Sequence, residues 1–210
     1  MPLTRQLSLF GAEAADPSPA DLAGLLAGPG QIARMGGTAR VSVVVADAWR
    51  VHVLLAELAS RHLPATWAPA GGEGQGEGHG YTVRTAYTAL LAPLAAAWLR
   101  GEAGKLPPPG FTLDGRRLRL WAVAAGSGDA TGGYTLRLGP SDEASWAPVG
   151  AALAALGLAA ALVSAGAGGP AYRIEGRRRL ARLAELVGDP PALAPPGTWP
   201  EPPPRRSAGR

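Results

Sequence analysis

The chain has 210 residues, of which 47% are hydrophobic, which is enough for one folded domain or for two small fused ones. Its net charge is +4, carried almost wholly by arginine beside a single lysine, Lys105, and this basic balance is compatible with an anionic partner such as nucleic acid. The lack of cysteine excludes disulfides and thiolate metal sites, and three histidines without paired ligand spacing argue against zinc.

Membrane and export signals are weak in this sequence. The N-terminus has no apolar signal-peptide core, and the longest apolar run, from Val149 to Val163, is interrupted by Gly150 and Gly157. A membrane span needs about 20 apolar residues. We therefore expect a protein without membrane contact, located in the cytoplasm and associated with the nucleoid.

Residues 1–18 are typical of a flexible arm, and they carry the pentapeptide Gln6-Leu7-Ser8-Leu9-Phe10. This pentapeptide resembles the consensus of bacterial sliding-clamp-binding peptides, QL(S/D)LF, at every position. The resemblance implies that Leu9 and Phe10 fill an apolar pocket of the DNA sliding clamp, that Leu7 fills a neighbouring one, and that Gln6 forms hydrogen bonds beside them. The alternative is a terminal strand that packs Leu7, Leu9 and Phe10 onto its own domain.

Residue periodicity predicts the elements of the first half. Asp21 is expected to N-cap a helix that starts at Leu22 and ends at the breaker Gly28-Pro29-Gly30. The later elements are expected as a strand at 40–45, a helix at 47–63, strands at 65–69 and 81–87, and a helix at 88–99, with an optional strand at 31–35. The glycine-rich stretch 71–80 is expected to be a turn, and its Glu73, Glu77 and His79 favour a solvated loop over a metal site.

The second half repeats this order after a proline-rich segment, 105–115, that suits a linker. A basic segment at 116–120 leads into a predicted helix at 121–125, followed by a strand at 134–138, a helix at 142–156, strands at 159–164 and 172–175, and a helix at 177–187. Trp49 and Trp146 fall at corresponding places. The sequence thus predicts a duplicated α+β unit over 19–104 and 116–188, and a disordered, proline-rich tail over 189–210.

The segment 22–30, LAGLLAGPG, resembles the LAGLIDADG motif that names a family of homing endonucleases, and the αββαββα order of both halves is similar to that family. The resemblance covers about residues 20–188. It implies an α+β fold in which two motif helices pack at the centre and two four-stranded sheets form a pseudo-symmetric saddle over double-stranded DNA, within a monomer. It also implies acidic residues at the helix ends that hold a catalytic metal near the scissile phosphates.

The chain departs from the motif at the acidic positions. Ala27 and Pro29 stand where the family has aspartates, and the looser second copy, 120–128, has Ser127 at the metal-binding place. Neither Pro29 nor Ser127 can supply a carboxylate to Mg²⁺. Asp129 could serve after a shift of register, but the first half offers no equivalent. We therefore expect no catalytic residues, no metal and no cofactor, as in degenerate members of the family that act as DNA-binding regulators.

Arginine recurs on the predicted strands. Strand alternation places Ser42 with Arg40, Thr82 with Arg84, and Thr135 with Arg137 on shared faces, where they suit contacts to phosphates and base edges. The candidate DNA-binding residues are Arg40, Ser42, Arg84, Arg137, Arg173, Arg177 and Arg178. The alternative for the strand residues is an ordinary solvent-facing surface, and for the helix at 177–187 a solvated helix face.

These observations favour a non-catalytic DNA-binding accessory protein that its arm recruits to the sliding clamp in DNA replication or repair. Two other hypotheses stay open. One is an endonuclease of the LAGLIDADG type with displaced acidic ligands, and the other is a clamp regulator that does not bind DNA.

Overall fold

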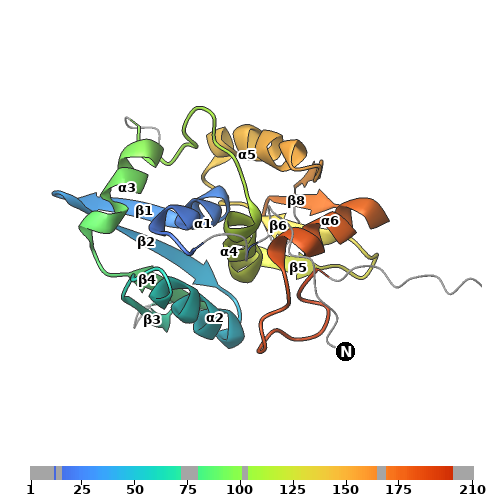
Figure 1. The fold of residues 1–210 in the computed structure, drawn as a ribbon, viewed down its shortest axis with the longest axis horizontal. Coiled ribbons are helices and arrows are strands. Elements are labelled where there is room, and N and C mark those ends of the chain that lie inside the picture. Colours follow the sequence, from blue (N-terminus) through green and yellow to red (C-terminus); the bar gives the residue numbers. More distant parts are fainter. Residues whose placement is uncertain (1–11, 13–15, 72–79, 101–103, 165–168, 201–210) are drawn as a thin grey trace, which may run out of the picture.

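The computed structural model describes residue 12 and the ranges 16–71, 80–100, 104–164 and 169–200. These residues form two α+β units, each with a four-stranded antiparallel sheet, with helices lying in front of the sheets in the view of Figure 1. The pentapeptide Gln6–Phe10 and the glycine-rich residues Glu73, Glu77 and His79 lie outside the described residues.

The first unit follows the predicted order. Its elements are η1 (Pro19–Leu22), α1 (Ala23–Ala27), β1 (Gln31–Met35), β2 (Thr38–Val45), α2 (Ala48–Ala59), β3 (Ala65–Pro69), β4 (Tyr81–Thr85), η2 (Ala89–Leu91) and α3 (Ala92–Trp98). The sheet order is β1-β2-β4-β3, so the optional strand at 31–35 is a regular member of the sheet. The predicted cap was wrong, because Ser18 caps the first turn in a capping box with Asp21 as its third residue.

The second unit repeats the first. Its elements are α4 (Gly115–Ala125), β5 (Gly126–Gly128), β6 (Tyr134–Arg137), α5 (Glu143–Ala155), β7 (Ala161–Val163), β8 (Ala171–Ile174) and α6 (Arg177–Val187). The sheet order β5-β6-β8-β7 matches that of the first sheet. The basic segment 116–120 belongs to α4 itself, because Asp114 caps the helix by accepting hydrogen bonds from the backbone N–H groups of Arg116 and Arg117.

The two motif helices, α1 and α4, pack together at the centre of the molecule (Figure 1). Small residues make this close contact possible. A Cβ on Gly24 would overlap the carbonyl oxygen of Arg117, and a Cβ on Gly28 would lie 2.5 Å from the indole of Trp121. Most of α4 is buried on every side, including its leucines and Trp121, as is typical of a helix enclosed by two units.

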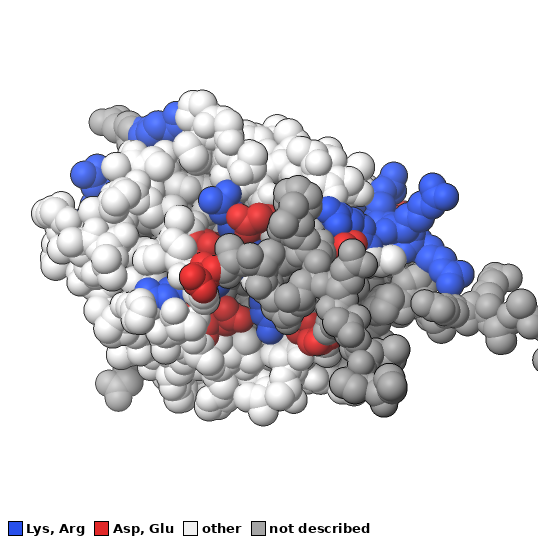
Figure 2. All heavy atoms as spheres, in the orientation of Figure 1, with Lys and Arg blue, Asp and Glu red and all other residues white. Residues whose placement is uncertain are grey.

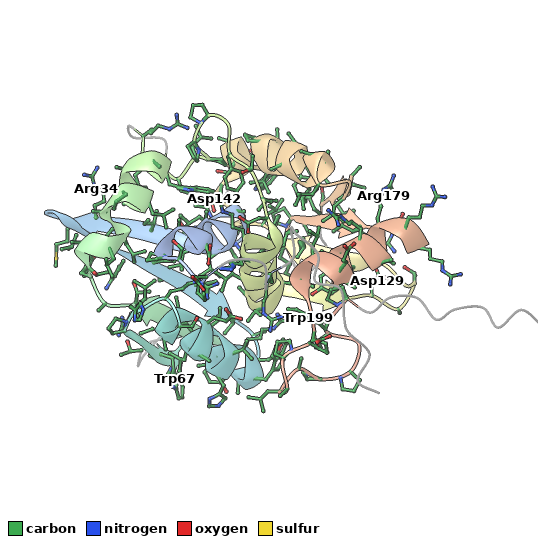
Figure 3. All side chains as sticks on the ribbon, viewed as in Figure 1. Arg34, Trp67, Asp129, Asp142, Arg179 and Trp199 are labelled. Atoms are coloured by element: carbon green, nitrogen blue, oxygen red, sulfur yellow. The ribbon has the colours of Figure 1, made fainter. Side chains whose placement is uncertain are left out.

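Two segments that were expected to be irregular are packed against the body. In the expected linker, Lys105 and Leu113 are buried, and Phe111 contacts Trp98 edge to face. In the expected disordered tail, residues 189–200 form no helix or strand, as their prolines predict, but Trp199 is buried next to the C-terminal end of α6 (Figure 3). Its indole N–H donates to the Gly188 carbonyl at 3.0 Å. The prediction of disorder was therefore wrong for 189–200. The prolines there exclude helix and strand, but the buried side chain of Trp199 still packs this segment against the body.

Among the helices that the structure describes, none has the length and the apolar character that crossing a bilayer requires.

Candidate nucleic-acid interface

Each sheet has one face packed under helices and one face turned away from them, which we call its open face. In β2, Val41, Val43 and Val45 are buried, whereas Arg40 and Ser42 point the other way. The register sets Ser42 opposite Arg84 of β4, so these residues share the open face of the first sheet. The predicted pairing of Arg40 with Ser42 on one face is confirmed.

The second sheet has the same arrangement. Tyr134 and Leu136 of β6 are buried, which leaves Thr135 and Arg137 on the open face. The register sets Thr135 opposite both Ser127 of β5 and Arg173 of β8. All four strand arginines that alternation pointed to, Arg40, Arg84, Arg137 and Arg173, therefore lie on open faces.

These arginines differ in their surroundings. The Arg40 guanidinium stacks over the Tyr87 ring at 4.8 Å, which restrains it without using its N–H groups. Arg173 is held by carboxylates, because its Nε donates to Asp129 at 2.8 Å and its guanidinium also pairs with Glu175. The hydrogen bond to Asp129 raises the pKa of Arg173 further. Arg173 therefore has much of its charge compensated within the protein.

Asp129 was the residue that a register shift would bring to a metal. It lies in the turn between β5 and β6, where its carboxylate accepts from Arg173 and, at 2.9 Å each, from the backbone N–H groups of Thr131 and Gly133. The hydrogen bond from Arg173, followed by that from Thr131, holds the pKa of Asp129 well below its ordinary value. Its oxygens are already used, so its position does not favour a role as metal ligand.

The C-terminal ends of α1 and α4 are where the LAGLIDADG resemblance places catalytic acids. Pro29 and Ser127 follow these ends and line a cavity of about 480 Å³ together with Val44, Asp47 and Arg137. The two motif positions supply no carboxylate, and Asp47, the one carboxylate among these lining residues, is paired with Arg50 at 2.9 Å, so this donor set does not fit a divalent cation. Across the part of the chain that the structure describes, no group of three His, Asp or Glu side chains is placed to hold a metal.

Two buried cations lie at these helix ends instead. Arg50 of α2 donates through Nη1 to the carbonyl of Val123 at 2.6 Å and through Nη2 to that of Gly126 at 2.6 Å, so it caps α4. Lys105 donates through Nζ to the carbonyls of Gly28 and Gly30, both at 2.6 Å, so it caps α1. A cation at a helix C-terminus compensates the partial negative charge of the last carbonyls.

Each capping cation is paired with an aspartate at the start of a helix. Arg50 pairs with Asp47, the N-cap of α2, at 2.9 Å, and Lys105 pairs with Asp142, the N-cap of α5, at 2.9 Å. Figure 3 shows Asp142 between α1 and α5. Burial lowers the pKa of Lys105, and Asp142 partly offsets this effect. Helices α2 and α5 are equivalent elements of the two units, so the two ion pairs occupy corresponding places in the repeat. Each ion pair also connects one unit to the motif helix of the other unit.

Sequence reasoning did not single out Arg50 and Lys105. The available signals were small: Lys105 is the only lysine, and Arg50 lies three residues after Asp47 on a helix of mostly apolar residues. Neither signal identifies the carbonyls of a distant helix as partners.

The arginines at the start of α6 lie apart from the open faces. Arg177 and Arg178 are exposed, and Figure 2 shows basic side chains gathered at the end of the molecule where α6 begins. Arg177 and Arg178 belong to α6 of the second unit, whereas Arg40 and Arg84 belong to strands β2 and β4 of the first sheet.

No family model and no curated protein matches the chain. Among solved structures, it is similar to the homing endonuclease I-WcaI bound to its DNA recognition sequence, at 12% sequence identity over 82% of each chain, with a TM-score of 0.59. It also matches a structure of mesophilic variants of the homing endonuclease I-DmoI, at 14% identity over 80% of this chain and 94% of that one, with a TM-score of 0.42. The likeness to I-WcaI shows the fold: two αββαββα-like units form a saddle of the LAGLIDADG type.

Proposed function

We propose that this chain is a non-catalytic DNA-binding accessory protein, recruited to the bacterial DNA sliding clamp by Gln6–Phe10 during DNA replication or repair. The observation that carries the proposal is the pair of open sheet faces with arginine on both, in a fold whose motif-helix ends hold cations in place of catalytic acids.

DNA binding is supported by the open faces. Arginine, serine and threonine side chains on strands suit contacts to phosphate oxygens, which fix a protein on a duplex, and arginine also reads guanine edges. Arg40, Ser42 and Arg84 supply these groups on the first sheet, and Thr135 and Arg137 supply them on the second. The I-WcaI structure, which has the same fold, is bound to its DNA recognition sequence.

The absence of catalysis is supported at the helix ends. Phosphodiester cleavage by a metal-dependent nuclease needs a divalent cation that is held by carboxylates against the phosphate. The two positions that would supply them are Pro29 and Ser127, and the adjoining carbonyls are bound by Lys105 and Arg50. The side-chain nitrogens of Lys105 and Arg50 already bind these carbonyls and are paired with Asp142 and Asp47, so neither the carbonyls nor the two carboxylates are left over for a metal ion.

Clamp recruitment is supported by the pentapeptide, which agrees with the clamp-binding consensus at all five positions. A short peptide with two or three apolar anchors binds weakly, with a Kd on the order of micromolar. Tethering to the clamp raises the local concentration of the protein at DNA, so that weak DNA contacts suffice.

The DNA half of the proposal is tested by fluorescence anisotropy with a short labelled duplex over a series of salt concentrations. Each lost phosphate contact is expected to reduce the slope of log K against log salt by about 1. Arg40→Ala and Arg84→Ala are each expected to show this reduction. Arg182→Ala, which removes the same charge from an arginine of α6 paired with Glu185, is the matched control and is expected to leave the slope unchanged. Equal slopes in all three variants would contradict the role of the open face.

The clamp half is tested by a calorimetric titration against purified bacterial sliding clamp, comparing the wild-type chain with Leu9→Ala/Phe10→Ala. Loss of the two anchor side chains is expected to abolish measurable binding, because they fill the main apolar pocket. Equal binding by both proteins would overturn the proposal.

A third experiment separates the accessory role from the endonuclease alternative. Supercoiled plasmid incubated with the protein and Mg²⁺ or Mn²⁺ is expected to stay intact. Cleavage that disappears in Asp129→Asn would identify an active nuclease with displaced ligands.

A further inference from the structure

The motif helix α4 runs between two different surfaces of the molecule. Its C-terminal end passes directly into β5, where Ser127 lies on the open face of the second sheet. Its first turn, with Arg116, lies at the other end. A helix from Gly115 to Ala125 spans about 16 Å. The first turn of α4 is therefore separated from the start of β5 by about the length of this helix.

The N-terminal arm meets the body at this first turn. The backbone N–H of Ala12 donates to the Leu186 carbonyl at the end of α6, at 2.9 Å, and Arg116 Nε donates to the Ala12 carbonyl at 3.1 Å. Arg116 is buried, and its two Nη atoms have no hydrogen-bond partner among the described residues. If the Ala12 carbonyl moved away, Arg116 Nε would also lose its acceptor inside a buried site. This cost favours retention of the hydrogen bond between Arg116 and Ala12.

The chain also enters the first unit from this side. Ser18 caps η1, and the carboxylate of Asp21 pairs with Arg61 of the segment after α2 at 3.0 Å and lies 4.0 Å from Arg116. Two separate stretches of the N-terminal region, at Ala12 and at 18–21, thus contact the body at the first turn of α4. Neither contact involves an open-face residue.

The sequence leaves little chain between this contact and the clamp-binding peptide. Only Gly11 separates Phe10 from Ala12, and two residue steps of extended chain reach at most about 7 Å. While Ala12 keeps its hydrogen bonds to Leu186 and Arg116, a protein that binds Phe10 must lie against the end of the molecule formed by the start of α4 and the end of α6.

We infer that the sliding clamp and duplex DNA are held on opposite sides of this protein, and that the two bind at the same time. The inference rests on the proposed function, because it takes the clamp as the partner of Gln6–Phe10 and DNA as the partner of the open faces. It adds that α4 is the spacer between them. The protein then bridges clamp and DNA, and clamp binding does not compete with DNA binding.

The absence of cysteine from the chain allows a direct test with single-cysteine variants. Glu185→Cys places a thiol on exposed α6 beside Leu186, and Val44→Cys places one on the open face, where Val44 is 54% exposed. The rate of modification by a maleimide–polyethylene glycol is measured for each full-length variant alone, with purified clamp, with duplex, and with both. Clamp is expected to slow modification of Glu185→Cys by several-fold or more and to leave Val44→Cys unchanged, and duplex is expected to do the reverse.

A second measurement follows the ternary complex. Labelled duplex saturated with the wild-type protein is titrated with clamp, and anisotropy is expected to rise a second time, with an apparent clamp affinity within about threefold of that measured without DNA. Leu9→Ala/Phe10→Ala is the control and is expected to give no second rise. A fall of anisotropy to the value of free duplex, or protection of Val44→Cys by clamp, overturns the inference while both binary interactions stand. Failure of either binary interaction by itself overturns the proposed function, and the inference with it.

Discussion

Lys105 and Arg50 illustrate how a single side chain changes the character of a helix end. The last carbonyls of a helix carry partial negative charge and need hydrogen-bond donors. A lysine with three donors, directed at Gly28, Gly30 and Asp142, satisfies all of them within a buried site. Without the ammonium, the carbonyls of Gly28 and Gly30 lose this donor, and the Asp142 carboxylate keeps the hydrogen bond from Gln31 Nε2 at 3.1 Å but loses its cation.

Replacing Lys105 with Met should therefore cost about 3 kcal/mol of unfolding free energy, because removing one partner of a buried ion pair leaves the other charge uncompensated. Urea denaturation at neutral pH measures this change. Arg179→Met, on the exposed start of α6, is the matched control and should change the free energy by less than about 0.5 kcal/mol. Equal midpoints for the two variants would contradict the structural role of Lys105.

Glu57 gives a pH-dependent prediction. Burial raises the pKa of Glu57, but hydrogen bonds from Arg61 and Arg119 outweigh it and leave the pKa below the ordinary value of 4.5. The unfolded chain therefore takes up this proton first as the pH falls. The stability that Glu57 contributes is complete above about pH 4.5 and is lost as the pH falls through its folded pKa.

Glu57→Gln should thus be less stable at neutral pH and should lose stability less steeply below pH 4.5 than the wild type, in urea denaturation repeated across pH 3–7. Exposed Glu143→Gln, on the first turn of α5, should follow the wild-type curve. Parallel curves for wild type and Glu57→Gln would show that the Arg61–Glu57–Arg119 contacts contribute nothing.

At the scale of elements, the decisive contact is that between α1 and α4. The two helices approach closely because Gly24 has no side chain where the backbone of α4 passes, at the carbonyl of Arg117. The approach also positions both C-terminal ends for their capping cations. The packing of α1 on α4 and the placement of Lys105 and Arg50 at the helix ends therefore both depend on Gly24.

Gly24→Ala should destabilise the protein by at least about 2 kcal/mol, because the new methyl group meets backbone that cannot move aside like a flexible side chain. Gly37→Ala is a suitable control, since a Cβ there meets nothing within 4 Å. It should be neutral or slightly stabilising through the unfolded state. Thermal melts of both variants, followed by circular dichroism, distinguish these outcomes, and a melting temperature of Gly24→Ala at or above that of Gly37→Ala would contradict the packing described.

At the scale of the whole molecule, the two units share one core. The buried apolar residues of α1, α4 and both sheets form a single cluster, and Arg50 and Lys105 each reach from one unit to the other. A helix as thoroughly buried as α4 exposes a large apolar surface when either unit is removed. Cooperative folding should therefore require both halves of the chain.

Residues 1–104 and 105–210, expressed separately, should each lack a cooperative unfolding transition, and co-expression should yield a one-to-one complex that unfolds near the wild-type temperature. Calorimetry and size-exclusion chromatography test this expectation. A sharp transition in either isolated half would show that its core is self-sufficient.

Local periodicity explains which parts of this architecture could be predicted. The alternation of valine with arginine and serine over 40–45 predicts both the strand and its open face, because strand period is a property of the neighbouring residues alone. The strand β5, Gly126–Gly128, was not predicted, since glycine disfavours strands and its pairing comes from β6. The caps at Arg50 and Lys105 escaped prediction because their partners lie more than 70 residues away.

The capping cations at the two helix ends also affect how single substitutions could introduce a metal site into this fold. A metal-dependent nuclease would need carboxylates in place of Pro29 and Ser127 and would need to lose Lys105 and Arg50. A carboxylate introduced alone would compete with Asp47 or Asp142 for the adjacent cation, and a cation removed alone would leave buried carbonyls with fewer donors. If the proposed non-catalytic role is right, each of these single changes is expected to lower the stability of the protein before any cleavage activity is gained.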